Sequence, residues 1–541
     1  MIRLDQDRTK TLLAIHGWSA VFLGLLLYAV ILTGVASVFA DEIGDWSSPL
    51  SGAVEDAYPV GTDRMLRDLA SGMDPDYHED LFFFPRAGGR LFAFFHGHEG
   101  ASAESEHPVE RGVAAEFDPR TGAILKRVEG TAEDIEAQDD SNALAHFMVD
   151  LHVRLHLPDP WGLLLTGILG LAMLVAAVTG FVVHRHLIRE LFTLRRRGDR
   201  LLTARDAHVI AGTWNLPFAF LLAFTGSYFS FGSALGIPAM AMVAFGGDQE
   251  LMIETVVGAP PAEDDRPAPM GNLDAMIADA RTRSGVDPAF VQVQRWGRAD
   301  ARVTMTMEYP RDGLTGPTYV YDGASGALLR TKPVLGQTPS AGNTLFQLMT
   351  PLHFGNFAGL FSKAIWFALG FAGAYVSITG LLLWTQRRRE QPTWMHLARA
   401  THWVGYGLPL ALTAAACTYF PARQAALEVA PMMMNAFLAT AALAAMAAWW
   451  LKELEAIRRV LLGATGIGLL LLPALRMLCG GTDWSAAFEA GLGTVLSMDL
   501  SLGLAGMLCL WGLRRTTSPA TTLQDAADGD RLENAEEVRS A

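Results

Sequence analysis

The amino-acid sequence alternates between long apolar runs and polar stretches. About 20 helical residues cross a bilayer core of roughly 30 Å. Residues 161–183 form 23 positions without a charge, and 209–244 is also uncharged. The pattern predicts a polytopic α-helical membrane protein of about eight spans. The apolar runs that predict these spans are 18–40, 161–183, 209–232, 364–385, 403–420, 429–451, 460–478 and 491–513.

Two polar segments, 41–150 and 246–347, interrupt the first four apolar runs. Each contains short runs rich in β-branched and aromatic residues, which are typical of strands. Each also contains a turn of the form Asp-x-x-Thr/Ser-Gly, from Asp118 to Gly122 and from Asp322 to Gly326. We therefore expect two similar α+β domains. The predicted strands lie at 81–85, 91–95, 116–126, 290–294, 301–307 and 318–321.

The net charge of −14 is distributed unevenly along the chain. Residues 40–150 hold 24 acidic residues against 8 Arg and Lys, whereas 185–205 holds seven Arg and two acidic residues. Cytoplasmic loops of membrane proteins are enriched in Arg and Lys, so this contrast indicates topology and not nucleic-acid binding. It places both polar inserts outside and both termini in the cytoplasm. Arg476 falls on the wrong side in this arrangement.

The predicted domain organisation follows from these patterns. Retention of the first apolar run as an anchor is favoured over cleavage as a signal peptide, because the run is longer than a typical signal core. In order, we expect a first span (1–40), a soluble domain (41–150), a second span (151–186), an Arg-rich cytoplasmic loop (187–207), a third span (208–245), a second soluble domain (246–347), a fourth span (348–386), four additional spans (387–515) and a disordered tail (516–541).

The membrane helices repeat, and the repeat selects four histidines. His16 and His208 are each followed 17 residues later by Thr-Gly. His152 and His353 are followed by Thr-Gly after 27 and 26 residues. The first 390 residues thus read as two copies of helix, soluble domain and helix, and internal duplication of this kind indicates the fold.

The depths of these histidines suggest a cofactor. His16 and His208 fall at the cytoplasmic ends of their spans, and His152 and His353 fall at the outer ends. A b-type haem needs two imidazoles that approach its iron from opposite sides, each from a different helix. The sequence therefore predicts two haem b groups, one per pair. Alternatively, each histidine is only a polar residue at the membrane interface.

The first 390 residues resemble the PepSY-associated transmembrane helix family, which includes inner-membrane ferric-siderophore reductases. The matching stretches are 151–156, 183–185, 206–208, 352–355 and the two Asp-x-x-Thr/Ser-Gly turns. The resemblance implies PepSY domains in the periplasm, haem between the helices and a place in the bacterial inner membrane. It does not cover the last four spans.

Several other polar residues leave alternatives open. His156 is a ligand of another haem, a donor to a ligand, or the true ligand in place of His152. His184 is a helix anchor or pairs with His402 around a third haem. Asp499 within an apolar run suggests proton handling, unless it lies at the mouth of its span. Of the histidines in the first insert, solvated loop positions are expected for His96, His98 and His107.

Certain motifs are missing from the sequence. It contains no glycine-rich nucleotide loop and no Cys-x-x-Cys-His, and its cysteines number three. Electrons would come from quinol or a cytoplasmic reductase. We expect a transmembrane oxidoreductase that delivers them to a periplasmic acceptor such as a ferric-siderophore. The alternatives are a non-redox membrane protein that binds or regulates partners through its PepSY domains, and a transporter with a path near Asp499.

Overall fold

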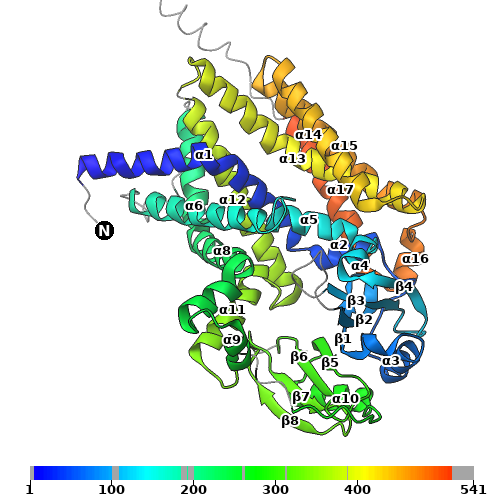
Figure 1. Ribbon diagram of the computed structural model, residues 1–541. Coiled ribbons are helices and arrows are strands. Elements are labelled where there is room, and N and C mark those ends of the chain that lie inside the picture. Colours follow the sequence, from blue (N-terminus) through cyan, green and yellow to red (C-terminus); the bar gives the residue numbers. More distant parts are fainter. Residues whose placement is uncertain are drawn as a thin grey trace, which may run out of the picture.

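The computed structural model describes residues 5–99, 109–183, 192, 200–256, 258, 262–310, 313–334, 336–386 and 388–514 (Figure 1). Most of the Arg-rich loop 187–207 and the whole tail 516–541 lie outside these residues. Within them, seven helices are long and apolar enough to cross a membrane, which confirms the predicted class. These are α1 (Gln6–Ser37), α6 (Trp161–Val183), α8 (Arg200–Ala244), α12 (Gly359–Gln386), α14 (Val429–Trp450), α15 (Leu454–Leu478) and α17 (Gly493–Arg514).

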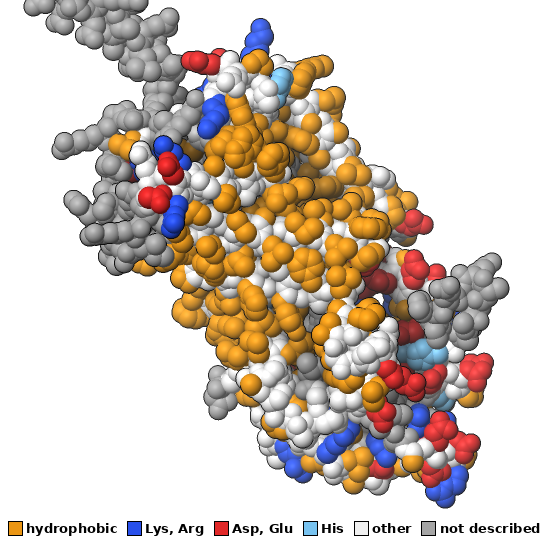
Figure 2. Space-filling view, turned by 60° about the vertical axis from the view of Figure 1, so that its left-hand side comes forward, with side chains coloured by type: hydrophobic (Ala, Val, Ile, Leu, Met, Phe, Trp, Pro, Cys, Tyr) orange, Lys and Arg blue, Asp and Glu red, His pale blue; other side chains and the backbone are white. Residues whose placement is uncertain are grey.

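The predicted fifth span, 403–420, lies within α13 (Pro392–Gln424), which is 33 residues long. This helix is not among the seven, but it packs against α12, α14 and α15. With the short α16 (Trp484–Glu489), helices α13–α17 form one unit beside the duplicated part, which we call the C-terminal unit. Figure 2 shows hydrophobic side chains over much of the middle of one face, with charged side chains gathered at the upper end and in the lower part of the view.

Two of the predicted spans each consist of two helices. The predicted span 151–186 is the end of α5 (Ala143–Val153) followed by α6, and 348–386 is the end of α11 (Ala341–Phe354) followed by α12. The chain leaves the helix after α5 because Leu155 and His156 adopt positive φ angles of 55° and 53°. Helix α11 ends at Gly355, which adopts a φ angle of 67°. The backbone N–H of Gly355 donates a hydrogen bond to the Pro351 carbonyl and so caps the helix.

The two soluble segments form one continuous antiparallel sheet of eight strands in the order β4-β3-β2-β1-β5-β6-β7-β8. Each segment contributes four strands, and the two halves of the sheet meet where β1 pairs with β5. This pairing runs from Phe83 opposite Val291 to Asp80 opposite Gln294. The strands are β1 (Asp80–Arg86), β2 (Arg90–Glu99), β3 (Val109–Phe117), β4 (Ile124–Thr131), β5 (Pro288–Gln294), β6 (Arg302–Met307), β7 (Thr318–Asp322) and β8 (Leu328–Lys332).

One face of the sheet carries the main soluble core. Helices α3 (Thr62–Ala70) and α10 (Leu273–Ser284) pack on it, with Leu66 and Ile277 among the buried residues. The two predicted turns are built alike, because Gly122 and Gly326 have φ angles of 71° and 75°. Shorter elements complete the fold: α2 (Ala40–Ser47), η1 (Pro75–His78), η2 (Ala87–Gly89), α4 (Ala132–Ala137) and α9 (Gln249–Val256).

Candidate functional site

The outer pair, His152 and His353, lies on the side of the soluble sheet. Each histidine is the penultimate residue of its short helix, α5 or α11. The two ring centroids are 6.2 Å apart, and the ring planes are inclined by 27°. The ring of Phe229 from α8 lies edge-on to His353 at a centroid distance of 5.4 Å. The structure thus brings together two histidines that are 201 positions apart in the sequence.

The inner pair, His16 and His208, lies on the long helices α1 and α8, away from the sheet. Nδ1 of His16 is 3.0 Å from the Ala176 carbonyl oxygen and 3.2 Å from Thr179 Oγ1. Nδ1 of His208 is 3.0 Å from Thr379 Oγ1. Each ring of this predicted pair is thus held against a helix of its own repeat, α6 for His16 and α12 for His208.

Hydrogen bonds to backbone carbonyls fix the proton position in one histidine of each pair. Nδ1 of His152 is 2.8 Å from the carbonyl oxygen of Val30, and Nδ1 of His16 is 3.0 Å from that of Ala176. A carbonyl oxygen can only accept a hydrogen bond, so we assign the proton to Nδ1 in both rings. Nε2 of each neutral ring then keeps its lone pair.

Threonine hydroxyls do the same for the other two histidines. Thr225 Oγ1 is 2.8 Å from His353 Nδ1, and this hydroxyl already donates its proton to the carbonyl of Leu221 at 2.8 Å. It can then only accept from the imidazole. Thr379 is arranged in the same way, since it donates to the Tyr375 carbonyl at 2.7 Å and faces His208. Among the described residues, none of the four Nε2 atoms has a hydrogen-bond partner.

The glycine after each threonine leaves room for an imidazole. A Cβ atom added to Gly34 would lie 2.7 Å from Cε1 of His152, a distance that side chains do not tolerate. The other three glycines back their histidines in the same way, with Cβ to Cε1 distances of 3.3 Å for Gly180 and His16, 3.4 Å for Gly226 and His353, and 3.2 Å for Gly380 and His208. The histidine of the partner helix in the same repeat therefore packs against each Thr-Gly.

Sequence reasoning used the Thr-Gly pairs only as markers of the repeat and missed their role as partners of the histidines. The signal was present, because Thr-Gly lies near the end of one helix and the histidine near the facing end of the next. Antiparallel neighbours in a repeat bring such ends together.

The secondary histidines do not join either pair. His156 follows α5, and its ring packs on Phe147 at a centroid distance of 4.5 Å. His402 of α13 bonds the Ala398 carbonyl on its own helix at 2.8 Å. His184, its predicted partner around a third haem, lies outside the described residues, as does His107.

The expectation of solvated loop histidines is wrong for His96. It lies in β2, 1% exposed, with its ring stacked on Phe94 at a centroid distance of 4.6 Å. Burial lowers the pKa of His96. His98 is on the same face of the strand and bonds Glu79 at 3.1 Å. Sequence alone placed the strand end too early, which made His96 look like a loop residue.

Asp499 and Arg476 form a buried ion pair. Arg476 Nη2 lies 2.7 Å from Asp499 Oδ2, and both side chains are almost fully buried. The arginine that fell on the wrong side of the predicted topology is therefore a buried ion-pair partner and not a topological signal. The carboxylate of Asp499, which had suggested proton handling, is thus bound in this ion pair.

The fold and these contacts define a class of protein. The chain is a multi-pass membrane protein with two helix–domain–helix segments whose strands form one sheet, and it brings the rings of His152 and His353 together. Residues 13–387 match the family model for the PepSY-associated TM region, so the chain belongs to that family. The match ends at α12, and the C-terminal unit lies beyond it.

The chain is also similar to a bacterial protein over much of its length. The uncharacterized protein PA4219 of Pseudomonas aeruginosa is 28% identical over 397 residues, covering 69% of this chain and 95% of that protein. Nearly the whole relative is thus matched by about two thirds of this chain.

Proposed function

We propose that the protein is a transmembrane electron carrier in which the outer pair and the inner pair each hold one b-type haem. The observation that supports this most is the state of the four imidazoles. All four Nδ1 atoms are engaged, and all four Nε2 lone pairs are left without a partner among the described residues. Neutral imidazole with one fixed nitrogen is the form that binds a metal.

The spacing of the outer pair fits this proposal. Bonds from imidazole nitrogen to a metal are about 2 Å, so two rings on opposite sides of one iron have centroids about 6 Å apart. The observed separation between the centroids of His152 and His353 is 6.2 Å. No three His, Cys, Asp or Glu side chains gather as a metal site within the described ranges. A pair of histidines suits a metal that brings its own remaining ligands, as haem iron does.

The surrounding residues would prepare these imidazoles for binding. Hydrogen bonds at Nδ1 orient a ring and raise the basicity of its Nε2. Gly34 and its three equivalents allow each ring to lie directly against the partner helix. Haem bound at such a pair supplies one-electron chemistry, and the protein sets its ligands, spacing and dielectric.

Two histidine pairs at different depths suit transfer across a membrane. His208 and Thr225, which mark the two sites on α8, are 17 residues apart, or about 25 Å along a helix. We propose that electrons enter at the inner pair from quinol or a cytoplasmic reductase. The soluble sheet and the outer pair would then face the periplasm, with the chain in a bacterial inner membrane and both termini in the cytoplasm.

The acceptor class that we propose is iron in a ferric-siderophore, by analogy with the family named above. Reduction of iron to the ferrous state weakens its binding by hard oxygen ligands and so favours release. This part rests on analogy, whereas the haem proposal rests on the histidine geometry.

The test is a reduced-minus-oxidised absorption spectrum of the purified full-length protein. We expect the bands of low-spin haem and extraction of the pigment by acid acetone, because the chain has no covalent attachment motif. In sealed vesicles, a donor on one side should reduce a membrane-impermeant ferric chelate on the other. Protein purified without pigment that also fails to take up added haem would favour a non-redox role.

A further inference from the structure

The C-terminal unit is fastened to the duplicated part of the chain by a buried polar cluster around Asp499 of α17. Trp46 of α2 donates its indole N–H to Asp499 Oδ1 at 2.7 Å. Trp484 of α16 donates to Oδ2 at 2.9 Å, and Arg476 of α15 binds the same oxygen at 2.7 Å. A buried carboxylate is tolerated only when its oxygens are satisfied in this way, and such clusters can specify one register of packing.

Further contacts join the C-terminal unit to the same small helix. The ring of Trp46 meets Phe420 of α13 edge-on at a centroid distance of 5.2 Å. Arg423 of α13 donates to the Ser47 carbonyl at 3.3 Å. Just beyond the helix, the N–H of Ala53 bonds the Ala490 carbonyl at 3.1 Å. Helix α2 is thus held by the C-terminal unit through side chain, ring and backbone.

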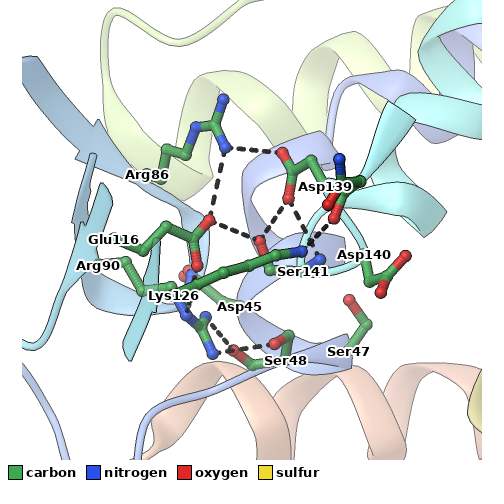
Figure 3. A network of polar contacts seen from close by, with 12 residues as sticks. Asp45, Ser47, Ser48, Arg86, Arg90, Glu116, Lys126, Asp139, Asp140 and Ser141 are labelled. Atoms are coloured by element: carbon green, nitrogen blue, oxygen red, sulfur yellow. Dashed lines mark hydrogen bonds and ion pairs between the residues drawn. The ribbon is translucent and has the colours of Figure 1, made fainter. Parts of the chain in front are cut away.

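Helix α2 also holds the soluble sheet. Asp45 accepts the backbone N–H of Gly88, in the turn between β1 and β2, at 2.6 Å. Arg90 of β2 donates to both oxygens of Ser48, directly after the helix. Figure 3 shows this network continuing through Arg86, Glu116, Asp139 and Ser141 towards the start of α5, with Arg86 2.7 Å from Asp139.

The next step leads from α2 to the outer pair. Ile43 and Trp46 of α2 share a buried apolar cluster with Phe147 and Leu151 of α5, the helix that carries His152. Residues of all five helices of the C-terminal unit, α13 to α17, also belong to this cluster. The other short helix, α11, packs on α8. The C-terminal unit therefore supports the helix of His152 and leaves that of His353 to the duplicated part.

We propose that Asp499 and Trp46 are positioning residues through which the C-terminal unit holds α2 and α5, and so fixes His152 opposite His353. This gives a role to the helices beyond the family match: they brace one half of the outer pair. Its spectroscopic consequence rests on the proposed function, whereas its effect on the mobility of α5 does not.

The test compares two matched variants that each remove one indole N–H from the same carboxylate. Trp46→Phe removes the bond that crosses to α2 and keeps an aromatic ring. Trp484→Phe removes the bond that stays within the C-terminal unit. Backbone hydrogen exchange is measured in the full-length protein for residues 40–47 and 143–153, with 341–354 as the internal reference.

We expect exchange in α2 and α5 to become about tenfold faster in Trp46→Phe, since a hydrogen bond to a charged group is lost, and to stay unchanged in α11. In Trp484→Phe, hydrogen exchange in α5 should be as slow as in the parent protein. In protein that holds haem, Trp46→Phe should shift the midpoint potential of one haem and spare the other. A pigment-free preparation that takes up no added haem, but in which exchange in α5 is faster, would support the brace and refute only the haem proposal.

Unchanged exchange in α5 of Trp46→Phe would overturn the proposal, as would equal effects of the two tryptophan variants. If Trp46→Phe does not fold, a second variant decides. Asp499→Leu combined with Arg476→Met removes both buried charges together and keeps an apolar fill, which proteins commonly tolerate. This double variant should accelerate hydrogen exchange in α5 and not in α11. An equal change in exchange rate in both helices, relative to the parent protein, would refute the brace.

Discussion

His353 donates its Nδ1–H to Thr225, 2.8 Å away, and this bond joins the end of α11 to α8. The equivalent bond between His208 and Thr379, at 3.0 Å, joins α8 to α12. Within the second repeat, each candidate ligand is therefore oriented by the threonine of a partner helix. The tautomer that presents Nε2 follows from these bonds and does not require a bound group to impose it.

Removing the threonine hydroxyl should weaken haem binding without abolishing it. In Thr225→Val the ring of His353 loses its partner at Nδ1, while the side-chain volume is nearly kept. Loss of such a partner typically reduces metal affinity by about 10- to 100-fold. We expect faster haem loss to apomyoglobin and a shifted midpoint potential for one haem. Thr413→Val, at a buried threonine of α13 whose hydroxyl donates to the Pro409 carbonyl of the same helix, is the control and should have no effect.

A methyl group at Gly34 should close the outer site. The Cβ of Gly34→Ala would lie 2.7 Å from the ring of His152 and would displace it. We expect loss of one haem from the spectrum, with the protein still folded. Gly232→Ala is the matched control, since a Cβ there meets nothing within 4 Å. Equal haem content in the two variants would show that the ring of His152 does not need this space.

Topology is testable with reporter fusions. The Arg-rich segments near 198 and 390 should lie in the cytoplasm, and the soluble sheet should lie outside. Fusions at Gly198 and Glu390 should therefore behave as cytoplasmic. Fusions at Gly130 and Gly313 should behave as periplasmic. A cytoplasmic signal at Gly130 would reverse the proposed direction of electron transfer.

Asp300 should make the soluble sheet sensitive to acid. Burial raises the pKa of this carboxyl, but hydrogen bonds from Arg298 and the Asp264 backbone and the charge of Arg295 outweigh it and lower the pKa to about 2. An unfolded Asp titrates near pH 3.9. The stabilisation is thus fully present above about pH 4 and is lost as pH falls towards 2. Asp300→Asn should lower the melting temperature at pH 7 and flatten this decline, whereas a decline as steep as in the parent protein would assign the effect to other groups.

Local sequence signals predicted much of the site. The equal spacing from His16 and His208 to Thr-Gly identified the repeat, and the repeat selected four histidines that each lie against a Thr-Gly in the structure. Apolar runs predicted the spans because burial in lipid requires about 20 apolar residues in a row. The break between α5 and α6 could also have been predicted, since Pro158 and Pro160 follow His156.

Contacts between distant segments could not be predicted in this way. The pairing of Leu81 with Val293 joins two domains into one sheet, and it depends on edges that no local pattern describes. Arg476 was misread because its partner, Asp499, lies on another helix. The role of the C-terminal unit was hidden for the same reason, since it depends on Trp46 at the opposite end of the chain.

The central claim is that each histidine pair holds one haem, and the most direct measurement is haem content per chain in paired variants. The parent protein should hold one haem for each pair. The double variant His152→Ala, His353→Ala should lose half of this content, and so should His16→Ala, His208→Ala. A variant that changes one histidine of each pair, His208→Ala with His353→Ala, should lose nearly all of it. Full haem content in that last variant would contradict the account.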